Sequence, residues 1–157
     1  MIQRIQTVYL LLIVVLMGVM CFLPLAVVEV GGLFYEWNLL GLSPMTETGE
    51  SETVSYMVEQ IAVVIGIALV ALIAIFLFKR RVIQLRLSMY NMFLLLGFYG
   101  LFAYNAYAMD GRMNAETEIA SYELALCFPF VCVVLNYLAI RGIGADEALI
   151  RSLDRLR

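Results

Sequence analysis

The sequence predicts an all-α membrane protein, a four-helix antiparallel transmembrane bundle with a short extracytoplasmic β-hairpin and a C-terminal cytoplasmic amphipathic helix. Composition is the first of three observations behind this fold class. Of the 157 residues, 64% are hydrophobic and only 15% are charged, unlike an ordinary soluble domain. Four apolar stretches are each long enough to cross about 30 Å of hydrocarbon. The charged residues between them also separate by sign from one connection to the next.

We place the four spans at about residues 7–28, 58–78, 87–109 and 119–140, within a single domain of residues 1–157. The first is expected to stay uncleaved, because it is longer than the apolar region of a signal peptide and Pro24 stands where cleavage needs a small residue. The second has no polar side chain over "VVIGIALVALIAIFLF" and is expected to act as scaffold. The third and fourth carry polar and small residues, so they should form the polar seam of the bundle.

Charge sorts the connections into two sets. Nine of the ten basic residues would lie on one side of the membrane, with only Arg112 opposite, and ten of the 13 acids share the side of Arg112. Because basic residues collect on the cytoplasmic side of a membrane, both termini are predicted to be cytoplasmic. The nine basic residues are Arg4, Lys79, Arg80, Arg81, Arg86, Arg141, Arg151, Arg155 and Arg157.

A β-hairpin is predicted within residues 26–38, "AVVEVGGLFYEWN", where the apolar pattern changes from helical to alternating. Gly31 and Gly32 accept the positive φ angles that two-residue turns need, which would pair Val30 with Leu33. Since a lone hairpin is marginal in water, we expect it to lie on the outer ends of the helices. A binding surface for an external partner is the alternative.

Four polar residues within the predicted spans should pair, because an unpaired amide or carboxylate in hydrocarbon is costly. Asn91 and Asn136 each lie a helical turn inside the cytoplasmic end of their span, roughly 6 Å deep at 1.5 Å per residue. Asn105 and Glu123 lie at equal depth from the opposite face. We therefore predict an Asn91–Asn136 contact near the cytoplasm and an Asn105–Glu123 contact near the exterior.

Glu123 is the one ionisable residue expected within a span, so a role in proton or cation transport is considered. Its shallow depth favours a plainer role. With Tyr104, Tyr107 and Tyr122 it would belong to the interfacial belt, where a carboxylate reaches water. Ion flux in liposomes that depends on Glu123 would favour transport instead.

Residues 146–157, "DEALIRSLDRLR", are predicted to form an amphipathic tail helix after a hinge at Gly142 and Gly144. Asp146 would stand at its start, where a carboxylate accepts hydrogen bonds from unpaired N–H groups. So short a helix is unstable alone in water, and docking must order it. The candidate docking sites are the lipid interface, another subunit and the chain's own basic turn. On its own chain the pairing would join Glu147 or Asp154 to Arg80, Arg81 or Arg86.

No catalytic, cofactor or metal site is predicted. The chain has no histidine, and its three cysteines fall inside predicted spans, where a thiol acts as a small apolar filler. Cys127 and Cys132 point different ways round a helix and make a poor ligand pair. The glutamates of the acidic loop 43–55 lack the rigid frame of a metal site. The basic turn 78–86 fits topology and contact with anionic lipid, and no nucleic-acid partner is expected.

The two ends of the chain, "MIQRIQTVYLL" and "LAIRGIGADEALIRSLDRLR", resemble a family of small four-helix bacterial inner-membrane proteins catalogued as a domain of unknown function. The resemblance covers the whole chain and is most specific at these ends. In that family a basic residue usually precedes the Asp-Glu pair, where this chain has Gly144 and Ala145. The resemblance implies a multi-pass protein of the bacterial inner (cytoplasmic) membrane with a motif-bearing surface at its cytoplasmic face. That surface comprises Gln3, Arg4, Gln6, Asp146, Glu147, Arg151, Asp154 and Arg155.

From these observations we expect a non-enzymatic structural or accessory subunit of a membrane complex. Its partners would be the lipid bilayer and either a membrane protein or a second copy of the chain. The alternative is a small transporter or channel that uses the polar seam of the third and fourth helices, distinguished by flux assays on Glu123 and Asn105 variants. A membrane enzyme ranks third, because the residues offer no convergent set of nucleophile, base and metal ligands.

Overall fold

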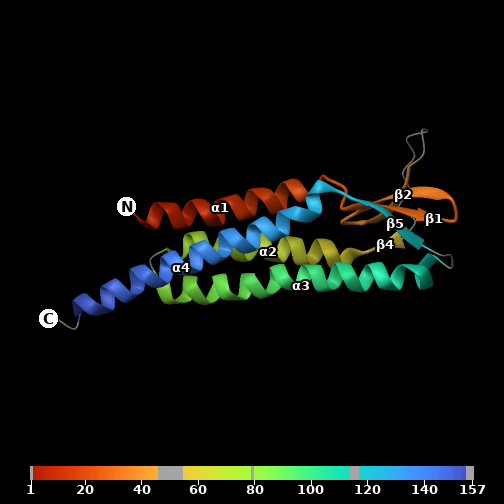
Figure 1. Cartoon of the computed structure of the whole chain (residues 1–157). Helices are drawn as coiled ribbons and strands as arrows, with labels where there is room; N and C mark the ends of the chain where they lie inside the picture. The colour runs from red at the N-terminus through yellow and green to blue at the C-terminus, as the bar shows by residue number, and fades with distance from the viewer. Residues whose placement is uncertain (1, 46–54, 79, 114–116, 155–157) are drawn as a thin grey trace.

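The computed structural model describes residues 2–45, 55–78, 80–113 and 117–154, and the chain is mostly helical with one antiparallel sheet (Figure 1). The predicted four helices are confirmed as α1 (Ile2–Met20), α2 (Val58–Phe76), α3 (Arg81–Met113) and α4 (Phe128–Asp154). Helices α1 and α3 each pack on both α2 and α4, which closes a four-helix bundle. Both termini lie at one end of the bundle and the sheet lies at the other (Figure 1).

Three helices are long and apolar enough to cross a membrane, over Val58–Phe76, Arg81–Met109 and Leu124–Leu149. Only 28% of the most apolar window of each is buried inside the chain, so most of these side chains face outward. The apolar part of α1 is shorter, Ile5–Met20. Length and composition therefore indicate a membrane protein, and a fourth crossing by α1 stays a prediction.

Each helix buries one stripe of side chains at alternating intervals of three and four residues, the spacing of left-handed helical bundles. The stripe of α3 changes character along its length. Nearest the termini it is polar, and it then becomes large and apolar before reaching Asn105 below the sheet. In order, its members are Gln84, Ser88, Asn91, Leu95, Phe98, Phe102, Asn105 and Met109.

A five-stranded antiparallel sheet caps the bundle, with strand order β4-β3-β2-β1-β5. The predicted hairpin is confirmed in its register, since Val30 pairs with Leu33 and the two turn glycines have φ angles of 59° and 85°. Its alternation holds in β1 and at Trp37, since Val28, Val30 and Trp37 are buried, but it fails next to the turn, where Leu33 is 64% exposed and Phe34 is 49% exposed. The strands are β1 (Ala26–Val30), β2 (Leu33–Asn38), β3 (Gly41–Pro44), β4 (Ser55–Tyr56) and β5 (Thr117–Tyr122).

The predicted boundaries of the first and fourth spans are wrong where they meet the sheet. Residues 26–28 belong to β1, and the first part of the predicted span 119–140 belongs to β5, which pairs antiparallel with β1. A single 3-10 turn, η1 (Leu124–Cys127), then leads into α4. Pro129 lies in the first turn of α4, where its fixed φ angle fits the start of a helix. Pairing of β5 with β1, which is distant in sequence, thus makes residues 119–122 a strand although the predicted span had placed them in a helix.

Trp37 joins the sheet to the bundle. Its indole stacks on Phe102 of α3, with ring centroids 4.4 Å apart and planes inclined by 18°. Its Nε1–H donates to Oε1 of Gln60 in α2 at 3.0 Å, and both residues are fully buried. Strand β2 is thus anchored to two helices by one side chain, which combines aromatic contact area with a satisfied polar group.

We expect Trp37→Phe to lower the free energy of unfolding by about 1–3 kcal/mol, because it leaves the buried Gln60 carbonyl without its donor. Gln60→Leu alone should be destabilising for the complementary reason. The double variant should lose less than the sum of the two single variants, because no buried group is then left without its partner across this bond. Thermal unfolding in detergent micelles measures this cycle, and strictly additive losses would contradict the role assigned to the hydrogen bond.

Candidate functional site

Two residues of the predicted motif surface, Gln6 and Asp146, come together at the end of the bundle that holds both termini. Gln6 of α1 donates from Nε2 to Oδ2 of Asp146 in α4 at 2.9 Å. Arg81, at the start of α3, donates to the backbone carbonyl of Asp146 at 3.4 Å. These bonds connect residues 140 and 65 positions apart in sequence. Asp146 therefore links three helices, and we call Gln6, Arg81, Gly142 and Asp146 the terminal junction.

Gly142 makes room for the Gln6 side chain. A Cβ added at Gly142 would lie 3.1 Å from Cγ and 3.2 Å from Nε2 of Gln6, which is only 5% exposed. At Gly144 the nearest atom, Cδ1 of Leu85, lies at an ordinary 3.6 Å. Close packing of α1 on α4 thus accounts for Gly142.

The predicted hinge at Gly142 and Gly144 is wrong. Helix α4 runs without interruption from Phe128 to Asp154. Its contacts with Gln6 and Arg81 at Asp146 fall at the point where the hinge was expected to separate the tail. The tail is therefore a continuation of α4, and Asp146 is an interior helical residue in place of the predicted helix start.

The remaining motif residues flank the terminal junction. Glu147 is half-buried and has an interaction partner of its own, and Leu149, two residues further, is 62% exposed. The basic turn does contact the tail, although the acceptor for Arg81 is the Asp146 carbonyl. Gln3 and Arg4 lie in the first turn of α1, Arg151 and Asp154 lie in the last turns of α4, and Arg155 lies outside the described residues.

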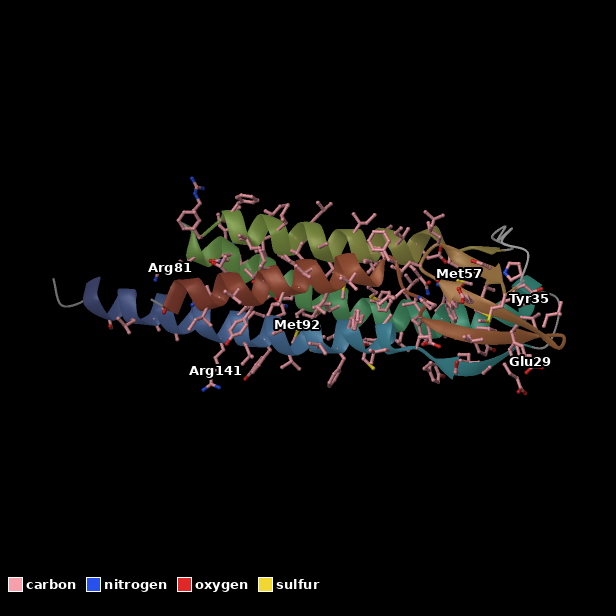
Figure 2. The ribbon with its side chains drawn as sticks, turned by 90° about the horizontal axis from the view of Figure 1, so that it is seen from above. Glu29, Tyr35, Met57, Arg81, Met92 and Arg141 are labelled. Atoms are coloured by element: carbon pink, nitrogen blue, oxygen red, sulfur yellow. The ribbon has the colours of Figure 1, made fainter. Side chains whose placement is uncertain are left out.

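Charge separates the two ends of the molecule. Arg80, Arg86 and Arg141 are exposed near the terminal junction, and Figure 2 shows Arg81 and Arg141 at the opposite end from Glu29. Of the described acids toward the sheet end, Glu29, Glu36 and Glu118 lie on strands and Glu123 follows β5, and the helices α2 and α3 carry Glu59 and Asp110. The spatial sorting that the sequence predicted is therefore present in the fold.

The predicted Asn91–Asn136 pair is offset by about one helical turn. Asn136 donates from Nδ2 to the backbone carbonyl of Ser88 at 2.8 Å. Neither side-chain atom of Asn91 has a hydrogen-bond partner among the described residues. The Tyr99 hydroxyl, which donates to the Leu126 carbonyl at 2.8 Å, ties α3 to η1, directly before α4. Depth estimated from the ends of apolar stretches missed the offset, because packing sets the register between helices.

The contact predicted between Asn105 and Glu123 includes no hydrogen bond between the two side chains. Asn105 is fully buried in α3, and both its side-chain polar atoms lack a partner within the described part of the chain. Glu123 lies between β5 and η1, and its backbone N–H donates to the Leu25 carbonyl at 3.0 Å. Glu123 therefore precedes the apolar segment Leu124–Leu149, formed by η1 and most of α4, that could cross a membrane.

Sequence reasoning missed two buried polar residues, Gln60 and Gln84, whereas Ser88 is among the polar residues expected in the seam of the third helix. Gln60 lies near the start of α2 and Gln84 lies in the basic turn, where polar residues are expected to be solvated. The available signal was spacing. Each falls three or four residues from the next buried position of its own helix, so the core stripe includes it.

The described residues contain no group of three or more acidic, cysteine or histidine side chains placed to hold a metal ion. Among the cysteines, Cys21 and Cys127 are exposed, whereas Cys132 is buried in the core stripe of α4. The arrangement at the terminal junction can therefore hold helices together and present charge. Its contacts form no nucleophile and base pair of the kind that covalent catalysis needs.

Residues 2–156 match the family model described as a domain of unknown function, DUF4293. No curated protein matches the chain. The family resemblance inferred from the two ends of the sequence is confirmed, and it extends over nearly every residue.

Gly144→Ala should raise the free energy of unfolding by about 0.5–1 kcal/mol, because alanine is the better helix former and its Cβ meets only ordinary contacts. Gly142→Ala should give no gain or a loss, since its Cβ pushes Gln6 away from Asp146. The two variants are matched in chemistry and helix. Equal stabilisation of both, measured by thermal unfolding, would contradict the close packing assigned to Gly142.

Proposed function

The chain belongs to the DUF4293 family, and we propose that it is a non-enzymatic integral membrane protein that serves as a structural or accessory subunit of a membrane complex. The observation that carries this proposal is the terminal junction, where Asp146 ties α4 to α1 and α3. A junction of this kind holds the last turns of α4 in a defined place relative to the bundle. A rigid, charged helix end suits recognition by another protein, since little ordering entropy is lost on binding.

The proposed setting is the inner membrane of a bacterium, crossed four times, with both termini in the cytoplasm. Support comes from the Arg-rich terminal end and the acidic sheet end. Near the sheet, Tyr104, Tyr107 and Tyr122 are 62%, 86% and 65% exposed, as expected of an interfacial aromatic belt. For α1, about 24 Å of apolar helix is followed by Phe22, which is 88% exposed, so the apolar segment continues past the helix.

The proposed docking element is the end of α4 beyond Asp146. Leu149, in this segment, is an apolar side chain that is 62% exposed among charged neighbours. The sequence places Ile150, Leu153 and Leu156 on the same side of a helical wheel as Leu149. A membrane-protein partner or a second copy of the chain would bury this apolar stripe and meet the charges beside it.

Topology can be tested with two tagged forms of the full chain, one with a tag inserted in the 46–54 loop and one with a tag after residue 157. Protease added outside intact spheroplasts should remove the loop tag and leave the C-terminal tag intact, because the loop would be external and the tail cytoplasmic. Permeabilised cells serve as the control in which both tags are cut. Removal of the C-terminal tag from intact spheroplasts would contradict the proposed orientation.

Partner binding can be tested by mild-detergent purification through the loop tag, followed by mass spectrometry and native mass measurement. Leu149→Glu should abolish the larger species, because a carboxylate would then be buried at the docking stripe. Leu40→Glu is the matched control, since Leu40 is 53% exposed at the sheet end. A single monomeric species from the unaltered chain would contradict the subunit role.

A small transporter or channel is the second candidate, and one observation favours it. Asn91 and Asn105 place buried polar atoms without described partners in α3, the helix of the predicted polar seam. The two are separated by Leu95, Phe98 and Phe102, of which the most exposed is 7% accessible, so the stripe presents no continuous polar path. Ion flux in liposomes that is lost in Asn105→Leu or Glu123→Gln would favour this candidate over the subunit role.

A further inference from the structure

We propose that the core of the bundle contains a site that binds an ordered water molecule, formed by Ser88 and Asn91 of α3 and Asn136 of α4. All three residues are fully buried. Four of their side-chain atoms have no hydrogen-bond partner among the described residues, namely Oγ of Ser88, Nδ2 and Oδ1 of Asn91, and Oδ1 of Asn136. Native interiors seldom leave such a cluster unsatisfied, because each lost bond costs on the order of 1–3 kcal/mol.

The three residues belong to one site by the geometry of the two helices. The Nδ2 group of Asn136 donates to the Ser88 carbonyl at 2.8 Å, which brings α4 against α3 at this level. Ser88 and Asn91 are successive members of the core stripe of α3, three residues apart, and therefore lie on the same face. Their unsatisfied atoms come from two helices that face each other across the bundle core.

The kinds of atom select the ligand. Oδ1 of Asn91 and Oδ1 of Asn136 are acceptors, Nδ2 of Asn91 carries two donor hydrogens, and Oγ of Ser88 can do either. Water both donates and accepts and so can satisfy the whole set. A metal cation would satisfy only the oxygens and would leave the Asn91 N–H groups unpaired. It would also lack a counter-charge here, because all three side chains are neutral, and a buried uncompensated charge is costly.

The core position of α3 between the site and the terminal junction is also polar. Along α3 the next core position toward that end is Gln84, 4% exposed, and on α1 the buried polar residue nearest the terminus is Gln6. Gln84 and Asn91 are seven residues apart, about 10 Å along the helix. In the other direction the stripe continues with Leu95 and Phe98, both fully buried. The site therefore lies between polar core positions toward the terminal junction and large apolar side chains toward the sheet.

The site can be detected directly in the unaltered chain by solution NMR in detergent micelles. Rotating-frame cross-relaxation between water and the Asn91 side-chain amide protons should be present, because a bound water donates to and accepts from that amide. The Trp37 indole N–H is the internal control, since it is fully buried and bonded to Gln60, and it should show none. Absence of the Asn91 signal would overturn the proposal.

Two further measurements distinguish a bound water from a dry site and from a bound cation. Asn91→Leu, close in volume, should lower the midpoint of thermal unfolding if water is bound, because the water loses a partner and Ser88 and Asn136 are left unsatisfied. It should raise the midpoint if the site is dry, since two orphaned atoms are then removed, and a raised midpoint would overturn the proposal. A shift of the Asn91 amide resonances on replacing choline chloride with sodium chloride would likewise overturn it, in favour of a cation.

Discussion

The cost of burying a polar group without a partner is the constraint on which the rest of the structure depends. In an interior that is mostly apolar, several buried or half-buried polar side chains form hydrogen bonds between elements. Trp37 and Gln60 join the sheet to α2, Asn136 joins α4 to α3, and Gln6 and Asp146 join α1 to α4. Each hydrogen bond has a specific geometry, so together they select one register among the many that apolar helices would tolerate.

The two ends of the bundle differ in chemistry and therefore in what they can do. At the sheet end, β1 lies between a neighbour in sequence, β2, and the distant β5, so that this cap ties the first and last connections of the chain together. At the terminal end, individual side chains connect the helices, and Asp146 accepts hydrogen bonds from residues of two other helices. Apolar surfaces between these ends face outward, which suits a lipid environment.

The core of the bundle is also divided into polar and apolar regions along its length. Large apolar side chains, Leu95 and Phe98, separate the polar cluster around Asn91 from Asn105 below the sheet. A bundle with this division is well suited to a fixed scaffold, because large apolar side chains interrupt the polar positions of its core. The same division gives the transport alternative a clear structural requirement. The apolar side chains between Asn91 and Asn105 would have to move apart to open a path.

The sequence by itself determined the four helices, the charged ends and the register of the Gly31–Gly32 hairpin, because periodicity, hydropathy and turn chemistry are local properties. Only the tertiary structure decided that Thr117–Tyr122 is a strand, that Gly142 makes room for Gln6, and that Asn136 meets Ser88. These outcomes depend on contacts between residues far apart in the chain. An edge of β1 had to be available before β5 could pair, and the packing of α4 had to be set before any polar partner was defined.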